Sequence, residues 1–355
     1  MNQRERQLTL NYECLHSMPS GLREVRVWWD PVLENWLVGK RIDLSEVQDS
    51  ADLVEPRVME MIDHPNVVKV RSVATVAGFP PPMRVVEVLM PFYDKGSITD
   101  ALEAGERFTA GQALGIIRAA LQGLTEMHER HGILHRDVKS PNLFLTGDAH
   151  TLKIGDLGLA GTMDATGKAP CVNAPQLYAP PELLTGNGLT RASDLYSLGV
   201  VLLELLRGKF DYDSYSKTHT VDSLLNGQSP LRTEDRVLPV WVCRSLRKIV
   251  QKAMDPEPPR RFQAAREMSD QIARVKIADW QETGADVWEA PFLRDNHMRV
   301  RVTAQPLCRG GGFTLITQRR KTTLWRRIET DVTVTDLRHQ RALAVFEKAN
   351  SLAVS

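Results

Sequence analysis

Two polar motifs joined by a predicted hairpin constrain the fold of this chain more than any other feature. The sequence His-Arg-Asp-Val-Lys-Ser-Pro-Asn spans residues 135–142, and an Asp-Leu-Gly motif begins at Asp156. Between the motifs, the apolar segments 143–145 and 152–154 flank a turn-rich stretch, a pattern typical of two antiparallel strands and their connection. Asn142 enters the first strand and Asp156 follows the second. We therefore expect them to be close neighbours, with paired Cα atoms about 5 Å apart.

This expected proximity of Asn142 and Asp156 indicates a site for a hard divalent cation. An amide oxygen and a carboxylate suit Mg²⁺, which keeps several waters and takes its remaining oxygens from substrate phosphates. Asp137 lies on the same loop as Asn142. The alternative, that the three side chains only cap loops, needs no metal. The hairpin geometry favours the metal site.

Length, charge and cysteine spacing exclude several classes of protein. A chain of 355 residues predicts a two-lobed domain with an additional piece. The net charge of +1 indicates no global attraction to nucleic acid or to a membrane. Four scattered cysteines match neither a disulfide framework nor a zinc site. The N-terminal residues lack a signal-peptide core, and the strongest apolar run, 198–206, is short and interrupted by Glu204. We expect a soluble cytoplasmic protein with no membrane partner.

Hydrophobic patterning divides the chain into three parts. Residues 10–90 contain strand-like segments and one helical stretch before His64, which predicts a small β-rich lobe. Residues 96–277 repeat apolar side chains at helical spacing and include the buried run 198–206, which predicts a larger α-helical lobe. Residues 278–355 combine short strands with a final amphipathic helix, which predicts a small α+β domain. The strand-like segments are 25–28, 36–38, 67–70 and 84–90, and the stripe of the final helix is Ala342, Phe346, Ala349 and Ala353.

In the order and spacing of several motifs, residues 10 to about 275 resemble the eukaryotic-like (Hanks-type) Ser/Thr protein kinases. The resemblance implies an α+β chain with a bilobal protein-kinase fold over residues 10–277. Its N-lobe would be 10–90, its hinge 91–95 and its C-lobe 96–277. It also implies transfer of the γ-phosphoryl group of ATP to a protein Ser or Thr hydroxyl, with Mg²⁺. The accessory domain, 278–355, resembles no family that we identify.

The resemblance assigns roles to the two polar motifs. Asp137 matches the aspartate that accepts the hydrogen bond of the substrate hydroxyl, and Lys139 matches the lysine that balances charge on the moving phosphoryl group. Asn142 and Asp156 match the metal ligands. A loose transition state delays proton removal, so Asp137 would act mainly by positioning. Glu182, Asp194 and Arg261 match structural positions of the family.

Residues in the N-lobe match the ATP-binding positions of the same family. Lys40 matches the strand lysine that holds the α- and β-phosphates, and Glu55 matches its helix partner. Met90 stands at the gatekeeper position, so the Pro91 carbonyl and the Tyr93 amide are the expected adenine contacts. Taken singly, Lys40 and Glu55 are equally typical of surface charges. Their joint order and spacing favour the ATP-binding assignment.

The loop that covers the ATP phosphates lacks the glycine fingerprint of the family. Gly21 remains nearby, so the backbone approaches phosphate less freely, although Ser20 and Arg23 can supply hydrogen bonds or charge in exchange. We assign Ser20 and Gly21 to the ATP phosphates and expect weak or unusual ATP binding. The three glycine positions are occupied by Met18, Ser20 and Arg23.

Two prolines also depart from the family pattern. Pro56 follows Glu55 inside a predicted helix, where proline removes a backbone hydrogen bond. Pro175 replaces a threonine of the activation segment, which removes one contact to Asp137 and Lys139. Two functions therefore stay open. The retained catalytic and metal residues favour an active kinase, and the missing glycines favour a pseudokinase scaffold that acts through its C-terminal domain.

Two further features suggest regulation and a partner. Thr162 and Thr166 lie between Asp156 and Glu182, in the part of the chain that matches the activation segment of the family. They are candidates for autophosphorylation, or else are turn-forming threonines. Residues 294–327 contain nine Lys or Arg and one acid, Asp295. This segment predicts a docking surface for nucleic acid or an acidic protein, or else a solvated face of a small domain. The expected partners are thus a protein substrate and an anionic macromolecule at 294–327.

Overall fold

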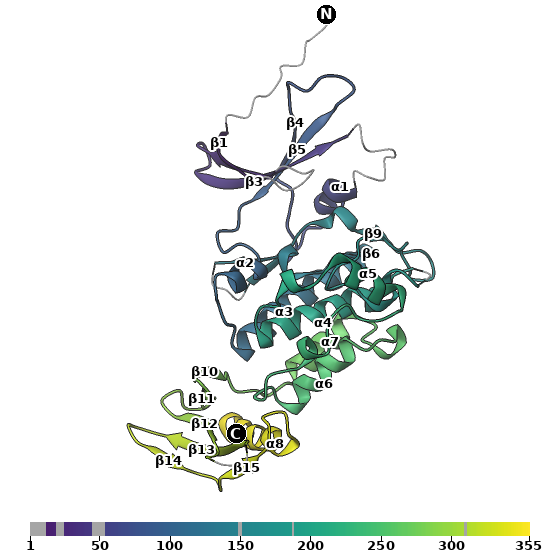
Figure 1. Ribbon diagram of the computed structural model, residues 1–355. Helices are drawn as coiled ribbons and strands as arrows, with labels where there is room; N and C mark the ends of the chain where they lie inside the picture. The colour runs from purple at the N-terminus through teal and green to yellow at the C-terminus, as the bar shows by residue number, and fades with distance from the viewer. Residues whose placement is uncertain (1–11, 19–24, 45–53, 148–150, 187, 309–310) are drawn as a thin grey trace, which may run out of the picture.

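A five-stranded antiparallel sheet forms the first part of the chain (Figure 1). Its strand order is β1-β2-β3-β5-β4, and helix α1 (Val54–Met61) follows β3 in the chain. The strands are β1 (Glu13–Met18), β2 (Val25–Asp30), β3 (Asn35–Asp43), β4 (Ser72–Thr75) and β5 (Val85–Pro91). The computed structural model describes residues 12–18, 25–44, 54–147, 151–186, 188–308 and 311–355.

The register of the central strands decides which side chains face the helical part. Lys40 pairs with Val25 on one side and with Val88 on the other, and side chains alternate along a strand. Gly39 therefore points to the opposite face, where an added Cβ would overlap the Glu87 carboxylate. That carboxylate accepts hydrogen bonds from the Trp28 indole and from Arg41. Only glycine leaves room for this buried network beside Lys40.

The predicted strand at 67–70 is wrong, and the fourth strand begins later, at Ser72. Val67, Val68 and Val70 are buried, and the Val68 amide donates to the Ile154 carbonyl at 2.8 Å. This apolar run packs against the helical part rather than extending the sheet. Burial on both sides explains why the segment resembles a strand by composition alone.

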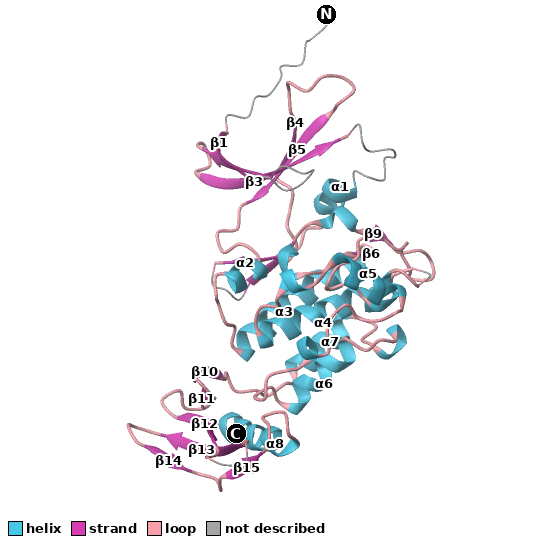
Figure 2. Ribbon diagram, in the orientation of Figure 1, coloured by secondary structure: helices cyan, strands magenta, loops and turns pink. Residues whose placement is uncertain are grey.

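Helices dominate the second part, as predicted (Figure 2). This part also contains two short antiparallel strand pairs: β6 (Ile133–Leu134) pairs with the distant β9 (Gly161–Thr162), and β7 (Leu143–Thr146) forms a hairpin with β8 (Thr151–Ile154). The helices are α2 (Ile98–Glu103), α3 (Ala110–Thr125), α4 (Arg191–Arg207), α5 (Lys217–Leu225), α6 (Arg244–Ala253) and α7 (Ala265–Ala273).

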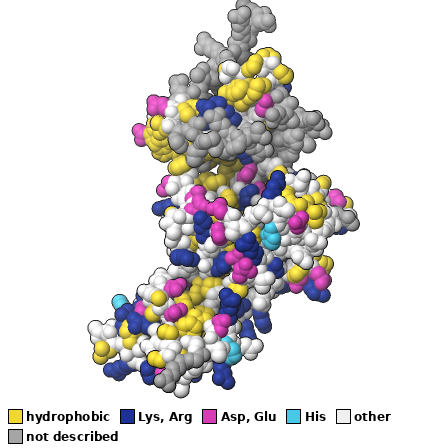
Figure 3. All heavy atoms as spheres, in the orientation of Figure 1, with side chains coloured by type: hydrophobic (Ala, Val, Ile, Leu, Met, Phe, Trp, Pro, Cys, Tyr) yellow, Lys and Arg dark blue, Asp and Glu magenta, His cyan; other side chains and the backbone are white. Residues whose placement is uncertain are grey.

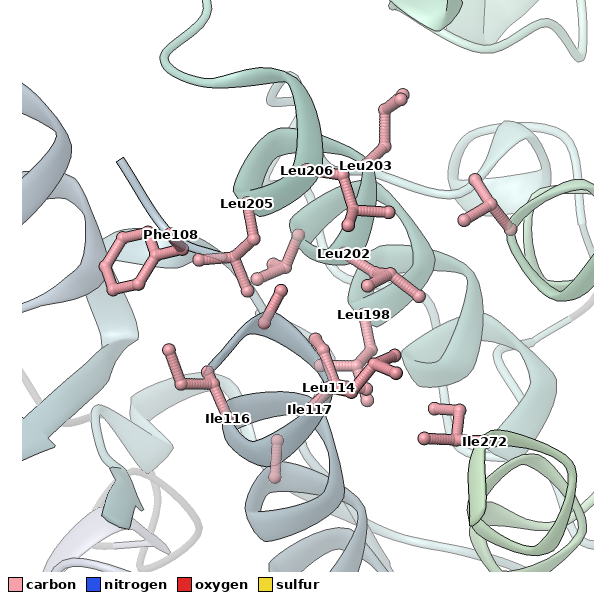
Figure 4. Packing of buried hydrophobic residues seen from close by; sticks show 14 of the residues in the cluster. Phe108, Leu114, Ile116, Ile117, Leu198, Leu202, Leu203, Leu205, Leu206 and Ile272 are labelled. Atoms are coloured by element: carbon pink, nitrogen blue, oxygen red, sulfur yellow. The ribbon is translucent and has the colours of Figure 1, made fainter. Parts of the chain in front are cut away.

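The core of the helical part lies between α3, α4 and α7. Leu198 and Leu202 of α4 face Leu114 and Ile117 of α3, and Ile272 of α7 points toward the same cluster (Figure 4). All five side chains are buried. The spacing of three and four along α3 therefore marks a core-facing stripe, as the sequence predicts. The polar motifs described below are part of the same helical region as this core.

A six-stranded sheet and one helix form the C-terminal module, residues 278–355. Its strand order is β10-β11-β12-β13-β14, with β15 paired to β13. Helix α8 packs on β12, β13 and β15 through the predicted stripe, and Phe346 contacts Trp288 edge to face at 5.2 Å between ring centroids. The predicted α+β architecture is confirmed. The elements are β10 (Gln281–Gly284), β11 (Val287–Pro291), β12 (Arg299–Pro306), β13 (Phe313–Arg320), β14 (Trp325–Arg327), β15 (Val332–Val334) and α8 (Gln340–Val354).

The C-terminal module is attached to the helical part by two of its acidic side chains, which accept hydrogen bonds from amides in the first turn of α3 and of α6. Asp279 Oδ1 accepts from the Gly111 amide in the first turn of α3 at 2.7 Å. Glu347 Oε2 accepts from the Arg244 amide at the start of α6 at 2.8 Å. The N-cap residue of α6, Cys243, provides no side-chain cap. The module thus satisfies backbone donors that the helix itself leaves unpaired.

Within the described part of the chain, no helix has the length and apolarity that crossing a membrane requires.

Candidate active site

The predicted hairpin between the two polar motifs is confirmed, but the residue opposite Asn142 is Gly155 and not Asp156. Strands β7 and β8 pair in antiparallel register from Leu143 with Ile154. The Gly155 amide donates to the Asn142 carbonyl at 2.9 Å, so Asn142 lies opposite Gly155 and Asp156 comes one position later. Asp156 has a φ of 55°, in the left-handed region, and this turns the chain at the end of the hairpin.

Three hydrogen-bond donors surround the carboxylate of Asp137. Lys139 Nζ lies 2.9 Å from Asp137 Oδ2, and Asn142 Nδ2 donates to the same oxygen at 3.0 Å. The second amide proton of Asn142 goes to the Asp137 carbonyl at 2.9 Å. Gln176 Nε2 donates to the other carboxylate oxygen, Oδ1. Asp137 is buried, so these contacts fix its orientation.

Asp194, at the start of α4, holds the backbone that precedes Asp137. Its carboxylate accepts from the amides of His135 and Arg136 at 2.9 and 2.8 Å, and from His128 Nε2 at 2.8 Å. Arg136 has a φ of 64°, a conformation that these bonds support. Burial alone would raise the pKa of Asp194, but the bonds and charges of the two histidines outweigh it and leave the pKa below its usual value.

Lys40 and Asp156 connect the sheet to the polar motifs across the two parts. Lys40 Nζ lies 2.7 Å from Asp156 Oδ1. Burial would raise the pKa of Asp156, but the charge and hydrogen bond of Lys40 outweigh it, so the pKa lies below its usual value. The side chain of Glu55 lies outside the described residues, and its pairing with Lys40 stays a prediction. Pro56 is the third residue of α1, in the first turn, where an amide has no intrahelical partner and proline is tolerated.

Asn142 and Asp156 fit a hard divalent cation. Because both amide protons of Asn142 are donated to Asp137, its side-chain oxygen remains as a ligand. An amide oxygen and an ionised carboxylate are the donors that Mg²⁺ prefers. No cluster of three or more His, Cys, Asp or Glu side chains suited to a metal occurs among the described residues. Two protein ligands leave the other positions to water and phosphate oxygens.

The predicted adenine contacts lie at the end of β5. Met90 and Pro91 are its last residues, and the following amide, of Phe92, donates to the Trp36 carbonyl at 3.1 Å. The Tyr93 ring stacks on Phe144 with centroids 5.8 Å apart. Burial raises the pKa of Tyr93 to about 12, although the charge of Arg71 counteracts part of this effect. The segment thus places Tyr93 next to β7, beside the polar motifs. Ser20 and Gly21 lie outside the described residues.

Arg136 ties the segment after Asp156 to the loop of Asp137. Its guanidinium donates to the carbonyls of Leu159, Ala160 and Pro170 at 2.6, 2.9 and 2.8 Å. A Cβ on Gly161 would overlap that guanidinium and force it to shift, and glycine avoids this. Burial lowers the pKa of Arg136, opposed by Asp194. Backbone carbonyls therefore hold this arginine.

Thr162 and Thr166, the candidate phosphorylation sites, are both exposed. Thr162 ends strand β9. Thr166 lies in a turn built on Asp164, where its hydroxyl and its amide both donate to Asp164 Oδ1, at 2.6 and 2.8 Å. The two threonines thus differ in their electrostatic surroundings.

Two buried carboxylates join the end of this segment to the helical core. Glu182 forms a bidentate ion pair with Arg261 at 2.8 and 2.7 Å, as the sequence predicts. Glu204 of α4 accepts hydrogen bonds from the hydroxyls of Ser140, Tyr178 and Tyr212. Burial raises the pKa of Glu204, although these hydroxyls counteract part of the effect. Sequence reasoning missed Glu204, because a glutamate within an apolar run shows no partner.

Gln176 is the second residue that sequence reasoning missed. The family pattern places the donor to the aspartate at position 175, where this chain has proline. The structure supplies the donor from the next residue. The only available signal was a polar residue beside that proline.

Comparisons with known proteins agree with this geometry. The family model for the protein kinase domain matches residues 34–272. Serine/threonine-protein kinase PknJ of Mycobacterium tuberculosis is 33% identical over 245 residues, which cover 67% of this chain and 39% of that protein. PknA of Corynebacterium glutamicum is 28% identical over 71% of this chain and 53% of its own length. Cytokinesis protein sepH of Aspergillus terreus is 28% identical over 55% of this chain and 14% of its own length. The chain therefore spans less than two thirds of these relatives.

Proposed function

Because the chain belongs to the protein kinase family, of the eukaryotic-like Ser/Thr type, we propose that it phosphorylates serine or threonine hydroxyls of proteins with ATP. The observation that carries the proposal is the convergence of four polar side chains from separate parts of the chain. Lys40 of β3 reaches Asp156 at 2.7 Å, and Lys139 reaches Asp137 at 2.9 Å within the same region. A scaffold has no chemical need for this arrangement.

The transfer needs positioning more than covalent help from the protein. The substrate hydroxyl oxygen forms a bond to the γ-phosphorus, the bond from that phosphorus to the bridging oxygen breaks, and ADP leaves with the electron pair. Asp137 accepts the hydrogen bond of the hydroxyl and passes its proton to solvent. Lys139 balances charge on the moving phosphoryl group, and Lys40 holds the α- and β-phosphates.

Asn142 and Asp156 would hold Mg²⁺ together with the phosphate oxygens. When bound, the cation neutralises charge that develops on the phosphates during transfer. The direct contact between Lys40 and Asp156 supports a common site for the phosphates and the cation. Pro91 and Tyr93 are proposed to contact the adenine, and Glu55 to orient Lys40.

The decisive experiment measures phosphate transfer from labelled ATP with Mg²⁺ to the chain itself and to a generic basic protein. We expect transfer by the wild type and its loss in Asp137→Asn and Asp156→Asn. Asp270→Asn, which changes an exposed carboxylate on α7, is the matched control and should keep full activity. Activity in Asp137→Asn equal to wild type would refute the assignment.

The alternative is a pseudokinase scaffold. It predicts a folded wild type that binds ATP weakly and transfers no phosphate. Absence of the glycine fingerprint before β2 favours this alternative, because glycines let the backbone approach phosphates. ATP affinity measured by calorimetry, alongside the transfer assay, separates a weak but active enzyme from a scaffold.

For the C-terminal module, we propose docking of an anionic macromolecule, nucleic acid or an acidic protein, at residues 294–327. Arg299 and Arg301 alternate with the buried Val300 and Val302 and lie on the sheet face opposite α8. Both also pair with Glu289, at 3.4 and 2.7 Å, which neutralises part of the basic surface. Space-filling shows charges of both signs interspersed over one side of the molecule (Figure 3). Docking would therefore rely on exposed arginines such as Arg319 and Arg326, which pair in register with Val300 and so lie on the other face of the sheet from Arg299 and Arg301. We also propose that the protein is located in the cytoplasm.

A further inference from the structure

Gln176 lies in the activation segment and contacts Asp137 although 39 residues separate them. An ionised carboxylate only accepts hydrogen bonds, so the amide of Gln176 must present its nitrogen to Asp137 Oδ1. The Gln176 carbonyl accepts from the Ala179 amide at 3.0 Å, which closes a turn that includes Tyr178. Tyr178 in turn donates to Glu204 of the core at 2.7 Å. Gln176 is thus held from the side of the rigid helical part.

The three donors divide the Asp137 carboxylate unequally. Lys139 and Asn142 both occupy Oδ2, and Gln176 occupies Oδ1. Each carboxylate oxygen has about two lone-pair directions, so Oδ1 keeps one for an incoming hydroxyl. Without Gln176, rotation of the carboxylate is restrained at Oδ2 alone. The direction in which Oδ1 faces the substrate then depends on Gln176.

Pro175 explains why this task falls to residue 176. Proline has no backbone N–H and no polar side chain, so position 175 offers Asp137 no donor. Gln176 is long enough to reach the carboxylate from the next position, and it does so.

We propose that Gln176 is a positioning residue for phosphoryl transfer, which orients Asp137 toward the hydroxyl of the protein substrate. The inference rests on the proposed kinase activity and adds to it a residue outside the usual polar motifs. Gln176 acts through Asp137 and contributes nothing to nucleotide binding.

The test compares Gln176→Leu and Gln176→Glu with the wild type in steady-state phosphate transfer. Leu removes the donor, and Glu replaces it with a carboxylate that repels the carboxylate of Asp137. One hydrogen bond to a charged group corresponds to a loss of about ten- to hundredfold in kcat. We expect at least this loss in both variants with an unchanged KM for ATP, and an unchanged melting temperature in Gln176→Leu. Gln122→Leu, an exposed position on α3, is the matched control and should behave as wild type.

A rescue variant separates positioning from a merely structural role. The double change Pro175→Thr with Gln176→Pro supplies a hydroxyl from position 175, and we expect it to recover most of the kcat lost in Gln176→Leu. An unchanged or increased kcat in Gln176→Leu would overturn the inference. So would variants that lose activity only because less protein folds, while kcat per folded molecule stays at the wild-type value.

The same experiment distinguishes this inference from the proposed function. An inactive wild type would reject the kinase activity, whereas an active wild type with fully active Gln176 variants would reject only the role of Gln176. Nuclear magnetic resonance of the Gln176 side-chain amide tests the contact without any activity. Its resonance should shift in Asp137→Asn and stay in place in Asp270→Asn. An unmoved resonance in Asp137→Asn would overturn the inference.

Discussion

At the scale of single residues, Asp194 shows how a buried carboxylate shapes a loop that it does not belong to. It accepts from two consecutive amides, of His135 and Arg136, and from the ring of His128. An isolated buried charge costs several kcal/mol, so the carboxylate is tolerated only because all these donors converge on it. The orientation of Asp137, the next residue along the chain, depends on this bracing.

We expect Asp194→Asn to lower the free energy of unfolding by about 3 to 5 kcal/mol at pH 7, the range for breaking a buried charged pair. The folded pKa of Asp194 lies below its usual value of 3.8, so the native state binds fewer protons than the unfolded state near that pH. Its stabilisation is complete above pH 3.8 and is lost as the pH falls through the folded pKa. Urea unfolding at pH 7, 5 and 3.5 measures it.

The difference in unfolding free energy between wild type and Asp194→Asn should therefore shrink only at pH 3.5. A difference that stays constant across the three, or one that grows on acidification, would contradict the assigned direction of the pKa. Asp270→Asn, which is exposed, gives the baseline.

At the scale of elements, the activation segment is tied down by Arg136, and Gly161 makes room for it. We expect Gly161→Ala to displace the guanidinium and to lower kcat about ten- to hundredfold, since small misplacements near a reacting group have effects of this size. Gly115→Ala, in open space on α3, should keep activity and raise stability by up to about 1 kcal/mol. Steady-state kinetics measure kcat and thermal melting measures stability in both variants. An equal kcat in the two variants would argue against a role of Arg136 in holding the activation segment.

The two candidate phosphorylation sites of the same segment should differ. A phosphate on Thr166 would face the Asp164 carboxylate that its hydroxyl now contacts at 2.6 Å, and like charges repel. We therefore expect autophosphorylation at Thr162 in preference to Thr166. Mass spectrometry after incubation with ATP and magnesium checks this, with Asp137→Asn as the inactive control. Modification elsewhere with both threonines untouched would refute the autophosphorylation hypothesis.

At the scale of the whole molecule, the C-terminal module supports the helical part by capping its helices. Asn350 also bridges the connecting segment, accepting from the Ala278 amide and donating to the Lys276 carbonyl. We expect Asp279→Ala and Glu347→Ala each to cost about 0.5 to 2 kcal/mol, the usual range for a lost cap. Denaturant unfolding compares them with Glu282→Ala, an exposed acid on β10. If Asp279→Ala and Glu347→Ala lose no more unfolding free energy than Glu282→Ala, the module does not stabilise the helical part through these caps.

The proposed anionic partner belongs to the same scale. Arg319 and Arg326 pair in register across β13 and β14 and are exposed. If single-stranded nucleic acid binds there, Arg319→Ala with Arg326→Ala should weaken binding and reduce the salt slope by about one to two. Fluorescence anisotropy from low to moderate salt measures this. Undetectable binding at low salt, or affinity that does not depend on salt, would exclude nucleic acid and leave either an acidic protein partner or a solvated face without a partner.

Trp325 pairs in register with Arg320 and so lies on the opposite face of the sheet from Arg319 and Arg326, where it is a poor base for stacking. The guanidinium carbons of Arg301 and Arg320 lie 3.9 and 4.8 Å from the centroid of its ring. Cations that already lie over the ring compete with a nucleic acid base for it. We therefore expect backbone charge rather than stacking to dominate any affinity at this surface.

Most of the long elements and the local motifs could be predicted from the sequence. Periodic apolar residues marked α3, α4 and α8, and the hairpin between Asn142 and Asp156 followed from short-range patterns, because helix and strand periods are local properties. It failed at 67–70, where burial against another part of the chain produces the same apolar run as a strand.

Contacts between side chains that are distant in the sequence became visible only in the folded structure. Gln176 on Asp137, Glu204 under three hydroxyls, Glu347 at the start of α6 and Glu289 beside two arginines all join residues that no periodicity relates. Such contacts depend on how whole elements pack, and packing places a side chain to within the few tenths of an ångström that a hydrogen bond requires. The residue types of the site could be predicted from short sequence motifs, whereas the contacts that orient these residues depend on how distant elements pack.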